Sequence, residues 1–474
     1  MRVSSVATRA TMVEDLADFV VGARWEALSA EASETLVARV LDSIGCAIAA
    51  ISSDVVGMVR RQVTELGGRP VCTLIGGGKT APDRAALYNG AAVRYLDFTD
   101  AYLAKGETCH PSDNLGAVLA AIEYAGGTGR NLITALAVAY QVQCRLSDVA
   151  PVRTRGFDHT TQGSYAAAAG VSHALGLDAA RTANALAIAG TAFNALRVTR
   201  TGALSNWKGL AYPNTGFSAV GACFLAREGV TGPDQVFEGN KGFMDSIAGK
   251  FEIDWRTEDL EKVRQTALKR YNAEIHAQSL IEAILELRQE HALTGAEVEQ
   301  VEIEVFDVAY NIIGGGEEGE KKLVRTKEEA DHSIPYIAAV AVLDGEVMPG
   351  QYVAERINRD DVQSLLQRVT VRPAADLSER FPAEEPCRVR IRLYDGAVLT
   401  REKADYLGYP TRPMSWGDVT MKFRTLVEPV AGAELASKIE DAVRSLDQLP
   451  VSDLCRLLES IPGPANTGAR GRHG

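Results

Sequence analysis

Cysteine is scarce in this sequence, and none of it is arranged in pairs. The seven cysteines among 474 residues are scattered, and no Cys-x-x-Cys motif occurs. Such sparse, odd-numbered cysteine argues against a disulfide framework and fits a reducing cytoplasm. It also argues against an iron–sulfur cluster, whose thiolate ligands come in closely spaced sets. Because no group of His, Cys, Asp and Glu has zinc-like spacing either, we expect neither a metal nor another cofactor.

Long apolar runs are absent as well. No stretch of about eighteen apolar residues occurs, so no membrane-spanning helix is expected. The segment Met1–Ser5 has no apolar core behind its charge, and we interpret it as a short disordered lead and not as a signal peptide. The net charge of −12 disfavours nucleic acid and anionic membrane as partners. Together these absences predict a cytoplasmic protein whose partner is a small molecule.

Two glycine-rich segments resemble phosphate-binding loops only in part. Residues 76–80 end like a Walker A loop, but position 73, where the first glycine is needed, is threonine. Residues 314–319 fit Gly-x-Gly-x-x-Gly, yet three nearby glutamates would repel a pyrophosphate and no apolar helix begins there. We therefore predict two flexible loops and no bound nucleotide.

The hydrophobic pattern predicts a mostly α fold in two domains, because a chain of 474 residues exceeds the size at which one core keeps growing. Apolar residues recur with helical spacing from about residue 11 to 265 and again from about residue 415. Thr11 and Glu14 have the spacing of a capping box, Asp178 begins one of these helices, and another is predicted over residues 215–227. Between these stretches, residues 301–305 and 388–393 alternate with period two, and Asp395-Gly396 is a hairpin signal from which the chain returns through residues 398–400. Residues 330–343 have the pattern of a helix.

We expect a large all-helical domain, residues 1–266 and 411–462, interrupted by a smaller α+β lid domain, residues 267–410. Residues 463–474 are expected to form a disordered tail. The predicted helices are rich in Ala and Gly on more than one face, which favours a compact helical core in several layers.

The densest group of chemically active side chains lies between Leu96 and Asn114. It holds four carboxylates, a histidine and an asparagine. The run His110–Asn114 leads directly into an apolar helical pattern, which predicts a loop entering a helix with Ser112 or Asp113 as its cap. Titratable groups at a helix N-terminus suit an anionic substrate and proton transfer. We interpret this region as an active site.

Seven separated motifs in the same order resemble the 2-methylcitrate dehydratase and cis-aconitate decarboxylase (MmgE/PrpD) family. They are Leu96–Phe98, His110–Asn114, Gly156–His159, Ala195–Gly202, Trp207–Ala211, Ala273–Gln278 and Asp331–Tyr336. The likeness runs from about Asp42 to about Tyr409. Glu274 resembles the dehydratase branch, since the decarboxylase branch has a histidine in that place. Ala101 departs from the family, which commonly has threonine there, and this departure leaves the exact substrate open.

The motifs and the resemblance together nominate the site residues. A catalytic role is expected of Asp97, His110, Lys208 and His276. Substrate binding is expected of Asp100, His159, Arg197, Arg200, Lys269, Arg270 and Glu274. Structural alternatives remain open for these residues. The aspartates could cap helices or form turns, Lys208 could lie at the surface, and the arginines could form surface salt bridges. His110 could be a cap or a core residue, His159 could serve packing, and His276 could form a structural hydrogen bond. The run Asp331–Ser333 is interpreted as a helix cap and left out of the site.

The expected activity is that of a cofactor-free hydro-lyase acting on a tricarboxylate. It would dehydrate 2-methylcitrate to 2-methyl-cis-aconitate, and citrate to cis-aconitate. The reaction needs a base for the C–H proton, an acid for the departing hydroxyl and cations for the carboxylates. The sequence does not order His110 and Asp97 in the first two roles. Decarboxylation of cis-aconitate, epimerisation of a dicarboxylate and non-catalytic binding of a carboxylate are the alternatives, and a homodimer is expected.

Overall fold

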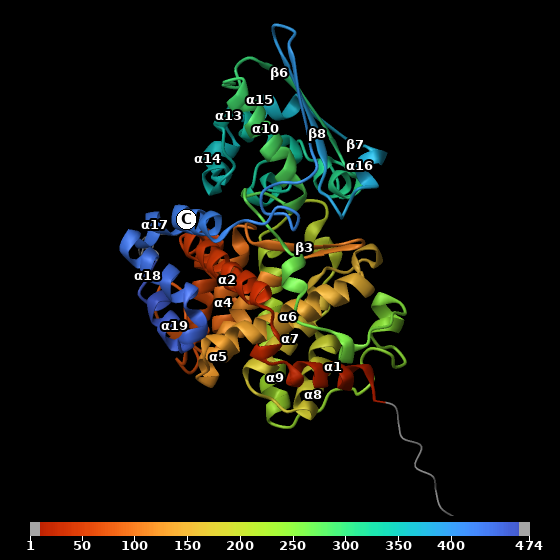
Figure 1. The fold of residues 1–474 in the computed structure, drawn as a ribbon, viewed down its shortest axis with the longest axis vertical. Coiled ribbons are helices and arrows are strands. Elements are labelled where there is room, and N and C mark those ends of the chain that lie inside the picture. Colours follow the sequence, from red (N-terminus) through yellow and green to blue (C-terminus); the bar gives the residue numbers. More distant parts are fainter. Residues whose placement is uncertain (1–9, 464–474) are drawn as a thin grey trace, which may run out of the picture.

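The computed structural model describes residues 10–463, and most of them are helical (Figure 1). The prediction of a mostly α fold is confirmed. The chain forms a helical part, at the bottom in Figure 1, and an α+β part above it. The predicted N-terminal lead and nearly all of the predicted tail lie outside the described residues.

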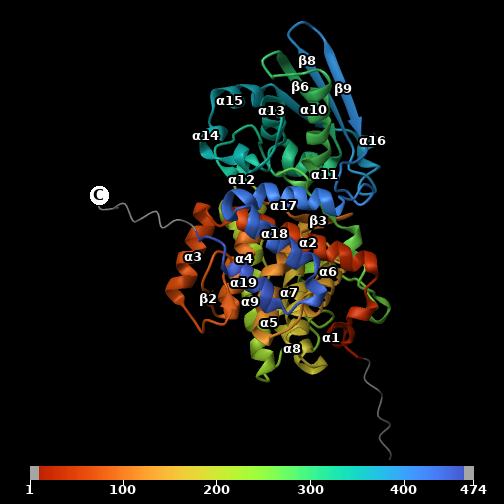
Figure 2. The ribbon, with the colours of Figure 1, turned by 60° about the vertical axis from the view of Figure 1, so that its left-hand side comes forward.

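The helical part contains helices from the first half of the chain and from its C-terminal end. The first set is α1 (Met12–Gly22), α2 (Ala30–Ala50), α3 (Asp54–Leu66), α4 (Pro82–Tyr95), α5 (Leu115–Ala125), α6 (Gly129–Val149), α7 (Thr160–Ala174), α8 (Ala179–Ala192) and α9 (Trp207–Arg227). The second set is α17 (Trp416–Ala431), α18 (Ala433–Arg444) and α19 (Val451–Glu459). Within the second set, α17 and α18 lie against α2, and α19 lies against α5 (Figure 2).

Local sequence signals explain where most of these helices begin and end. Glu14 accepts hydrogen bonds from the backbone and side chain of Thr11, which is the predicted capping box of α1. Asp178 caps α8, and α5 ends at Gly126 in the left-handed region, with φ of 69°. The exception is α9, expected from about residue 215. It begins eight residues earlier and accommodates Pro213 within it, so Lys208 lies in its first turn.

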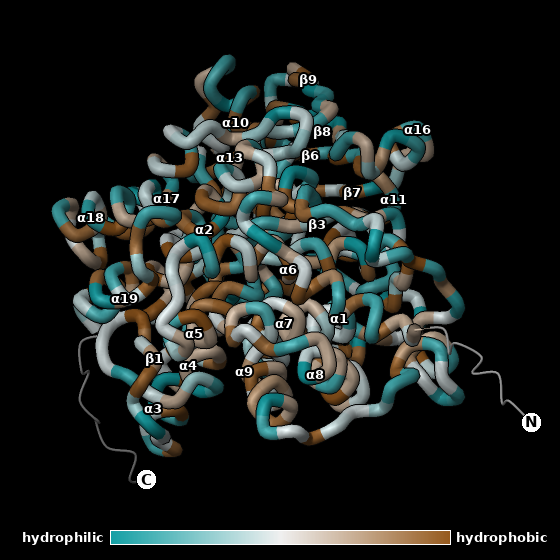
Figure 3. The backbone as a smooth tube through the Cα atoms, turned by 60° about the horizontal axis from the view of Figure 1, so that its bottom comes forward, coloured by the Kyte–Doolittle hydropathy of each residue, from teal (hydrophilic) through white to brown (hydrophobic). Residues whose placement is uncertain are grey.

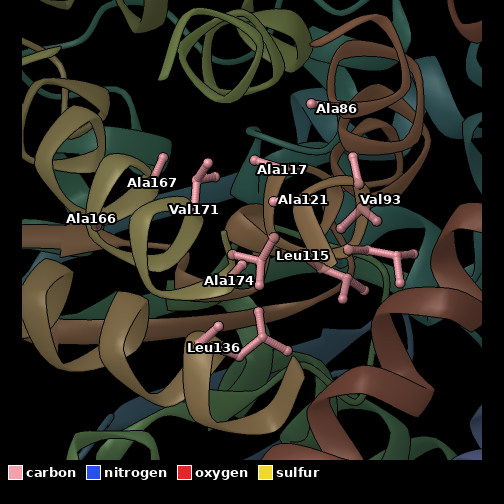
Figure 4. Packing of buried hydrophobic residues seen from close by; sticks show 14 of the residues in the cluster. Ala86, Val93, Leu115, Ala117, Ala121, Leu136, Ala166, Ala167, Val171 and Ala174 are labelled. Atoms are coloured by element: carbon pink, nitrogen blue, oxygen red, sulfur yellow. The ribbon is translucent and has the colours of Figure 1, made fainter. Parts of the chain in front are cut away.

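Small side chains allow the inner helices to approach one another closely. Ala and Val side chains of α4, α5 and α7 meet in the core (Figure 4). A Cβ atom on Gly116 of α5 would lie 2.5 Å from the backbone nitrogen of Gly90 on α4, so only glycine fits at this crossing. In Figure 3 the apolar stretches run through the interior around α4, α5 and α9.

The helical part also contains short strands, so the expectation of an all-helical domain needs a correction. β1 (Cys72–Thr73) pairs with β2 (Lys79–Thr80), and β3 (Asp100–Ala104) pairs with both β4 (Glu107–Cys109) and β5 (Ala267–Leu268). The β3–β5 pairing brings residues before Lys269 beside those after Asp97. Strands of two to five residues leave no periodic signal that could predict them.

The α+β part is built around a four-stranded sheet of order β7-β6-β8-β9. Its elements are α10 (Gln278–Glu290), β6 (Val298–Val305), α11 (Asp307–Ala309), α12 (Lys327–Ala330), α13 (Ile334–Asp344), α14 (Ala354–Ile357), α15 (Asp360–Gln367), β7 (Val369–Pro373), α16 (Ala375–Ser378), β8 (Cys387–Leu393) and β9 (Val398–Lys403). Strands β6, β8 and β9 match the alternating segments, whereas β7, parallel to β6, was not anticipated. The helix expected over residues 330–343 is divided at Asp331–Ser333.

The two parts have separate hydrophobic cores. One buried cluster draws on residues 13–268 and 419–461, and the other on residues 273–391. The chain therefore leaves the helical part near residue 268 and returns to it with α17. No single helix among the described residues is long and apolar enough to cross a membrane, and α2 with α3 passes such a test only as a pair bent by 89°.

Candidate active site

Four helices begin around one buried group of charged side chains. α5 follows the turn Pro111–Asn114, α7 follows His159, α9 carries Lys208 in its first turn, and α13 follows Asp331-His332. Motifs far apart in the sequence thus meet where the two parts of the molecule touch. A helix N-terminus carries partial positive charge, so this convergence favours an anionic ligand.

Asp97 lies at the centre of this group. Its backbone has φ of 55°, a conformation uncommon for a residue other than glycine. Arg94 Nη1 lies 2.5 Å and Lys269 Nζ 2.6 Å from Asp97 Oδ1, and Lys208 Nζ lies 3.5 Å from Oδ2. Burial by itself would raise the pKa of Asp97, but the three cations outweigh it and hold that pKa well below its usual range. Asp97 is therefore an ionised carboxylate that organises cations, an environment that disfavours the expected proton transfer.

Lys208 joins the helical part to the α+β part. Its Nζ lies 2.8 Å from Asp331 Oδ1 and 2.9 Å from His332 Nδ1, and Lys327 Nζ lies 2.7 Å from Asp331 Oδ2. Burial lowers the pKa of Lys208 to about 8 against the opposing charge of Asp331, so the ammonium form still predominates at neutral pH. The helix cap predicted within Asp331–Ser333 is confirmed at Ser333, which caps α13, but Asp331 and His332 contact Lys208 and belong to the ionic group from which the run was left out.

His110 is held as a neutral base. Its Nδ1 lies 2.9 Å from the carbonyl oxygen of Asp100; a carbonyl only accepts, so Nδ1 carries the proton and Nε2 is free to accept one. Burial, followed by the charges of Arg94 and Lys269, holds the pKa of His110 well below its usual range. The ring edge of His159 packs against His110 with centroids 5.4 Å apart.

Both oxygens of Asp100 are engaged by the protein. The Tyr140 hydroxyl donates to Oδ2 at 2.7 Å and the Ser112 backbone N–H donates to Oδ1 at 3.1 Å. Arg39 Nε lies 3.7 Å from Oδ2. The structure therefore gives Asp100 an anchoring role under the His110 loop, where substrate binding was expected.

The two arginines of the Ala195–Gly202 motif converge on a carboxylate of the protein itself. Arg200 Nε lies 2.6 Å and Arg197 Nη1 3.9 Å from Asp158 Oδ2. Arg197 also pairs with Glu318 of the α+β part. The arrangement has the form of the expected carboxylate clamp, closed here on Asp158 and Glu318.

The chain is similar to known proteins over most of its length. Residues 14–256 match the family model of the MmgE/PrpD N-terminal domain, and residues 271–448 match that of the MmgE/PrpD C-terminal domain. The chain belongs to the MmgE/PrpD family. It is 29% identical to a 2-methylcitrate dehydratase of Cupriavidus necator, over 84% of this chain and 86% of that one. It is 26% identical to the cis-aconitate decarboxylase of Mus musculus, over 81% and 79% of the two chains.

Relatives in the MmgE/PrpD family thus carry names of two reactions, both acting on substrates rich in carboxylates. A third relative, the 2-methylcitrate dehydratase of Escherichia coli K12, is 28% identical over 72% of this chain and 73% of its own. The names support an enzyme, and they do not decide between the two reactions.

Two nominated residues of this MmgE/PrpD chain lie away from the ionic group. Arg270 is exposed, with its guanidinium over the ring of Tyr271, so it is not placed to bind a buried substrate. His276 is enclosed by Phe306 and Phe381, and its Nε2 lies 3.9 Å from Glu274 Oε1. Burial lowers the pKa of His276 to about 3, so this histidine is neutral near pH 7, and its catalytic role stays a prediction.

Two carboxyl groups of the site stay protonated to unusually high pH. Burial raises the pKa of Glu274 to about 7, and its Oε2 accepts the His276 backbone N–H at 2.8 Å. Burial also raises the pKa of Asp113 to about 7 against the charge of Arg94, whose Nε lies 3.4 Å away. Neither Ser112 nor Asp113 caps α5, because the turn before the helix places Asn114 at its N-cap.

Lys422 of α17 supports the site from below and was missed in the sequence. Its Nζ lies 2.7 Å from Asp42 Oδ1 and donates to the carbonyl oxygens of Phe98, at 2.6 Å, and Lys269, at 2.8 Å. One ammonium thus ties α2 to the backbone beside Asp97 and to that of Lys269. Arg94 was missed too, although its spacing of three from Asp97 is a readable ion-pair signal.

Three of the assembled residues could in principle ligate a metal. The ligand atoms of Asp97, Asp331 and His332 lie within 4.8 Å of one another. The Lys208 ammonium contacts all three, at 3.5, 2.8 and 2.9 Å, and so fills the position that a cation would take. This donor set suits an ammonium better than a further cation, and the absence of a cofactor stays a prediction.

The site is closed in this structure. The side chains of Asp97, Lys208, Lys269 and Asp331 are at most 4% exposed. Their charges are satisfied by one another, which is how buried ions are tolerated. Contacts between the two parts, such as Lys208–Asp331 and Arg197–Glu318, hold it closed.

Proposed function

We propose that the protein is a cofactor-free hydro-lyase that dehydrates a tricarboxylate of the 2-methylcitrate type. The observation that supports this most strongly is a pair of titratable groups with opposite states on one ionic centre. His110 is a neutral base, and Glu274 is a protonated acid up to about pH 7. The charges of Lys269 and Asp97 act on the pKa values of both groups, so both groups lie around the same ionic centre. A substrate bound at this centre would be close to the base and to the acid.

The cations of the site would hold the substrate carboxylates. Lys208, Lys269, Arg197 and Arg200 now pair with carboxylates of the protein. A tricarboxylate replaces such partners with its own oxygens when the site opens and closes around it. The same cations would stabilise the negative charge that develops on a carboxylate when the neighbouring C–H bond is broken.

His110 is assigned the role of base. Its Nε2 takes the proton from the carbon next to a carboxylate, while Nδ1 keeps its hydrogen bond to Asp100. The electron pair of the C–H bond becomes the new carbon–carbon double bond. Glu274 gives its proton to the hydroxyl group, which leaves as water, and the two protons are accounted for.

Decarboxylation of cis-aconitate is the second candidate, because relatives of that name match the chain over a similar length. The two reactions differ in the atom that the acid protonates. Dehydration must protonate a departing hydroxyl, whereas decarboxylation loses carbon dioxide and protonates carbon. The decarboxylase branch of the family has a histidine at the position of Glu274. The glutamate at this position therefore favours dehydration.

A product assay on the chelator-treated protein tests this proposal. It is incubated with 2-methylcitrate, citrate and cis-aconitate, while ultraviolet absorbance and carbon dioxide are followed. We expect absorbance from a new conjugated double bond with 2-methylcitrate and no gas. Carbon dioxide from cis-aconitate without dehydration would establish the second candidate, and recovery only on adding a metal would refute the cofactor-free mechanism.

Three further features belong to the proposal. The α+β part is a lid that closes the site and excludes water during the reaction. The protein acts as a homodimer, and it acts in the cytoplasm. These remain predictions from the sequence and the family.

A further inference from the structure

The glycine-rich loop after α11 folds back onto the active site. It was expected to be a flexible loop, but the Gly316 N–H donates to Tyr310 O at 3.0 Å and the Glu318 N–H to Asn311 O at 2.9 Å. A Cβ atom on Gly316 would lie 2.6 Å from Asn311 Oδ1, so the tight return requires glycine. The fold of this loop brings Glu318 and Lys321 against the ionic group.

Lys321 differs from the other buried lysines around the site. Its side chain is buried, with the residue 7% exposed. Lys208, Lys269, Lys327 and Lys422 each have an oxygen partner at 2.6 to 2.8 Å. Within residues 10–463, no carboxylate oxygen lies within 4.0 Å of Lys321 Nζ, and no hydrogen-bond acceptor is paired with it.

The carboxylates nearest to Lys321 already serve other groups. Glu318 pairs with Arg197, Asp331 with Lys208 and Lys327, and Glu274 accepts a backbone N–H. Burial lowers the pKa of Lys321, with these acids opposing the shift. A largely buried ammonium that has no partner in the protein keeps little contact with water, so an anion that reaches it would be bound favourably.

The position of Lys321 is fixed by the site as well as by its own loop. The Ser333 hydroxyl, next to Asp331-His332, donates to the Lys321 carbonyl oxygen at 2.5 Å. Lys321 is thus tied to the segment that carries the partners of Lys208. The charges that act on its ammonium are those of Glu318, Glu274, Asp331 and Arg197, so it lies within reach of the ionic group.

We propose that Lys321 binds one carboxylate of the substrate, in a subsite distinct from those of Lys208 and Lys269. This inference rests on the proposed function and names its substrate class: the enzyme selects tricarboxylates over dicarboxylates because Lys321 needs an additional carboxylate. Binding would give the ammonium the charge-assisted hydrogen bond that it lacks.

Calorimetric binding to the full-length protein tests this subsite without requiring turnover. The probes are tricarballylate and two dicarboxylates that each lack one of its carboxylates, glutarate and methylsuccinate. Wild type should bind tricarballylate about 10- to 100-fold more tightly than the better dicarboxylate, the range for a hydrogen bond to a charged group. The K321M protein should bind tricarballylate no more tightly than wild type binds that dicarboxylate. Deleting the cation and deleting the carboxylate should therefore not be additive.

Three controls make the result decisive. K322M removes the charge of the neighbouring, partly exposed lysine and should bind as wild type does. K321R keeps the charge and should retain part of the preference, and melting temperatures verify that each variant is folded. Equal affinity of K321M and wild type for tricarballylate would overturn the subsite, as would a wild type that binds no tricarboxylate. If tricarballylate binds as expected but 2-methylcitrate is not turned over, the subsite stands and the dehydratase proposal fails.

Discussion

Two networks of ion pairs lie in contrasting surroundings, one in the active site and one on the outer face of the α+β sheet. On that face Arg388 of β8 contacts Glu402 at 2.7 Å and Glu304 at 3.1 Å, and its side chain is 35% exposed. In the site, Lys422 contacts Asp42 at 2.7 Å with the two side chains 5% and 1% exposed. The contacts are similar in length, but those on the sheet face are open to water and those in the site are buried.

Burial changes what such a pair contributes. An exposed pair is screened by water and contributes about 0 to 1 kcal/mol to stability. Loss of one partner from a buried pair leaves an uncompensated charge and costs about 3 to 5 kcal/mol. The sheet face can lose a charge with little effect, whereas the site is a set of charges that depend on one another and on an incoming anion.

The largest effect on stability is expected from Lys422→Met. The substitution keeps the aliphatic volume but leaves the Asp42 carboxylate and the carbonyls of Phe98 and Lys269 without their shared cation. We expect a loss of about 3 to 5 kcal/mol in the free energy of unfolding, measured by denaturant titration. Lys438→Met removes an exposed lysine that pairs with Glu434 and is the matched control. A loss below about 1 kcal/mol for Lys422→Met would show that burial does not separate the two networks.

His110→Asn should lower activity strongly and leave stability unchanged. Asparagine can still donate a hydrogen bond to the Asp100 carbonyl but cannot take a proton near neutrality. We expect kcat to fall by about 10²- to 10⁴-fold with the melting temperature retained. His291→Asn, at an exposed histidine, should change neither quantity. Normal turnover by a partly unfolded His110→Asn protein would make His110 a structural residue.

The smallest effect is expected from Arg388→Ala. The side chain loses pairs with Glu402 and Glu304, but all of them lie at the surface. The free energy of unfolding should change by less than about 1 kcal/mol, and the change should shrink as salt is added. A larger, salt-independent loss would mean that the outer face is as interdependent as the site.

The sequence was informative where one segment alone determines a feature. The capping box of α1, the Asp178 cap and strands β6, β8 and β9 each depend on neighbouring residues. The approach of Asp97, His110, Lys208 and Arg200 could be expected from the motifs, because the family resemblance fixes which segments share a site.

Features that depend on contacts between distant segments could not be predicted from the sequence. Asp331-His332 carries a strong cap signal, and only the fold shows that Ser333 alone uses it. Lys422 lies on an amphipathic helix far along the chain, and Lys321 follows a loop that looked flexible. Arg270 directly follows Lys269, and His276 shares a motif with Glu274, yet Arg270 is exposed and His276 lies in an aromatic cluster.

The dependence of kcat/KM on pH for dehydration of 2-methylcitrate, in wild type and in Glu274→Gln, is the decisive measurement. The lowered pKa of His110 keeps the base neutral, so no loss is expected on the acid side until well below pH 6.5. The raised pKa of Glu274 means that the acid loses its proton as the pH rises, so activity should fall through about pH 7. In Glu274→Gln the rate should be lower throughout and this fall should be absent. Activity that instead rises through pH 7, or a fall that persists unchanged in Glu274→Gln, would contradict the assignment of His110 as base and Glu274 as acid.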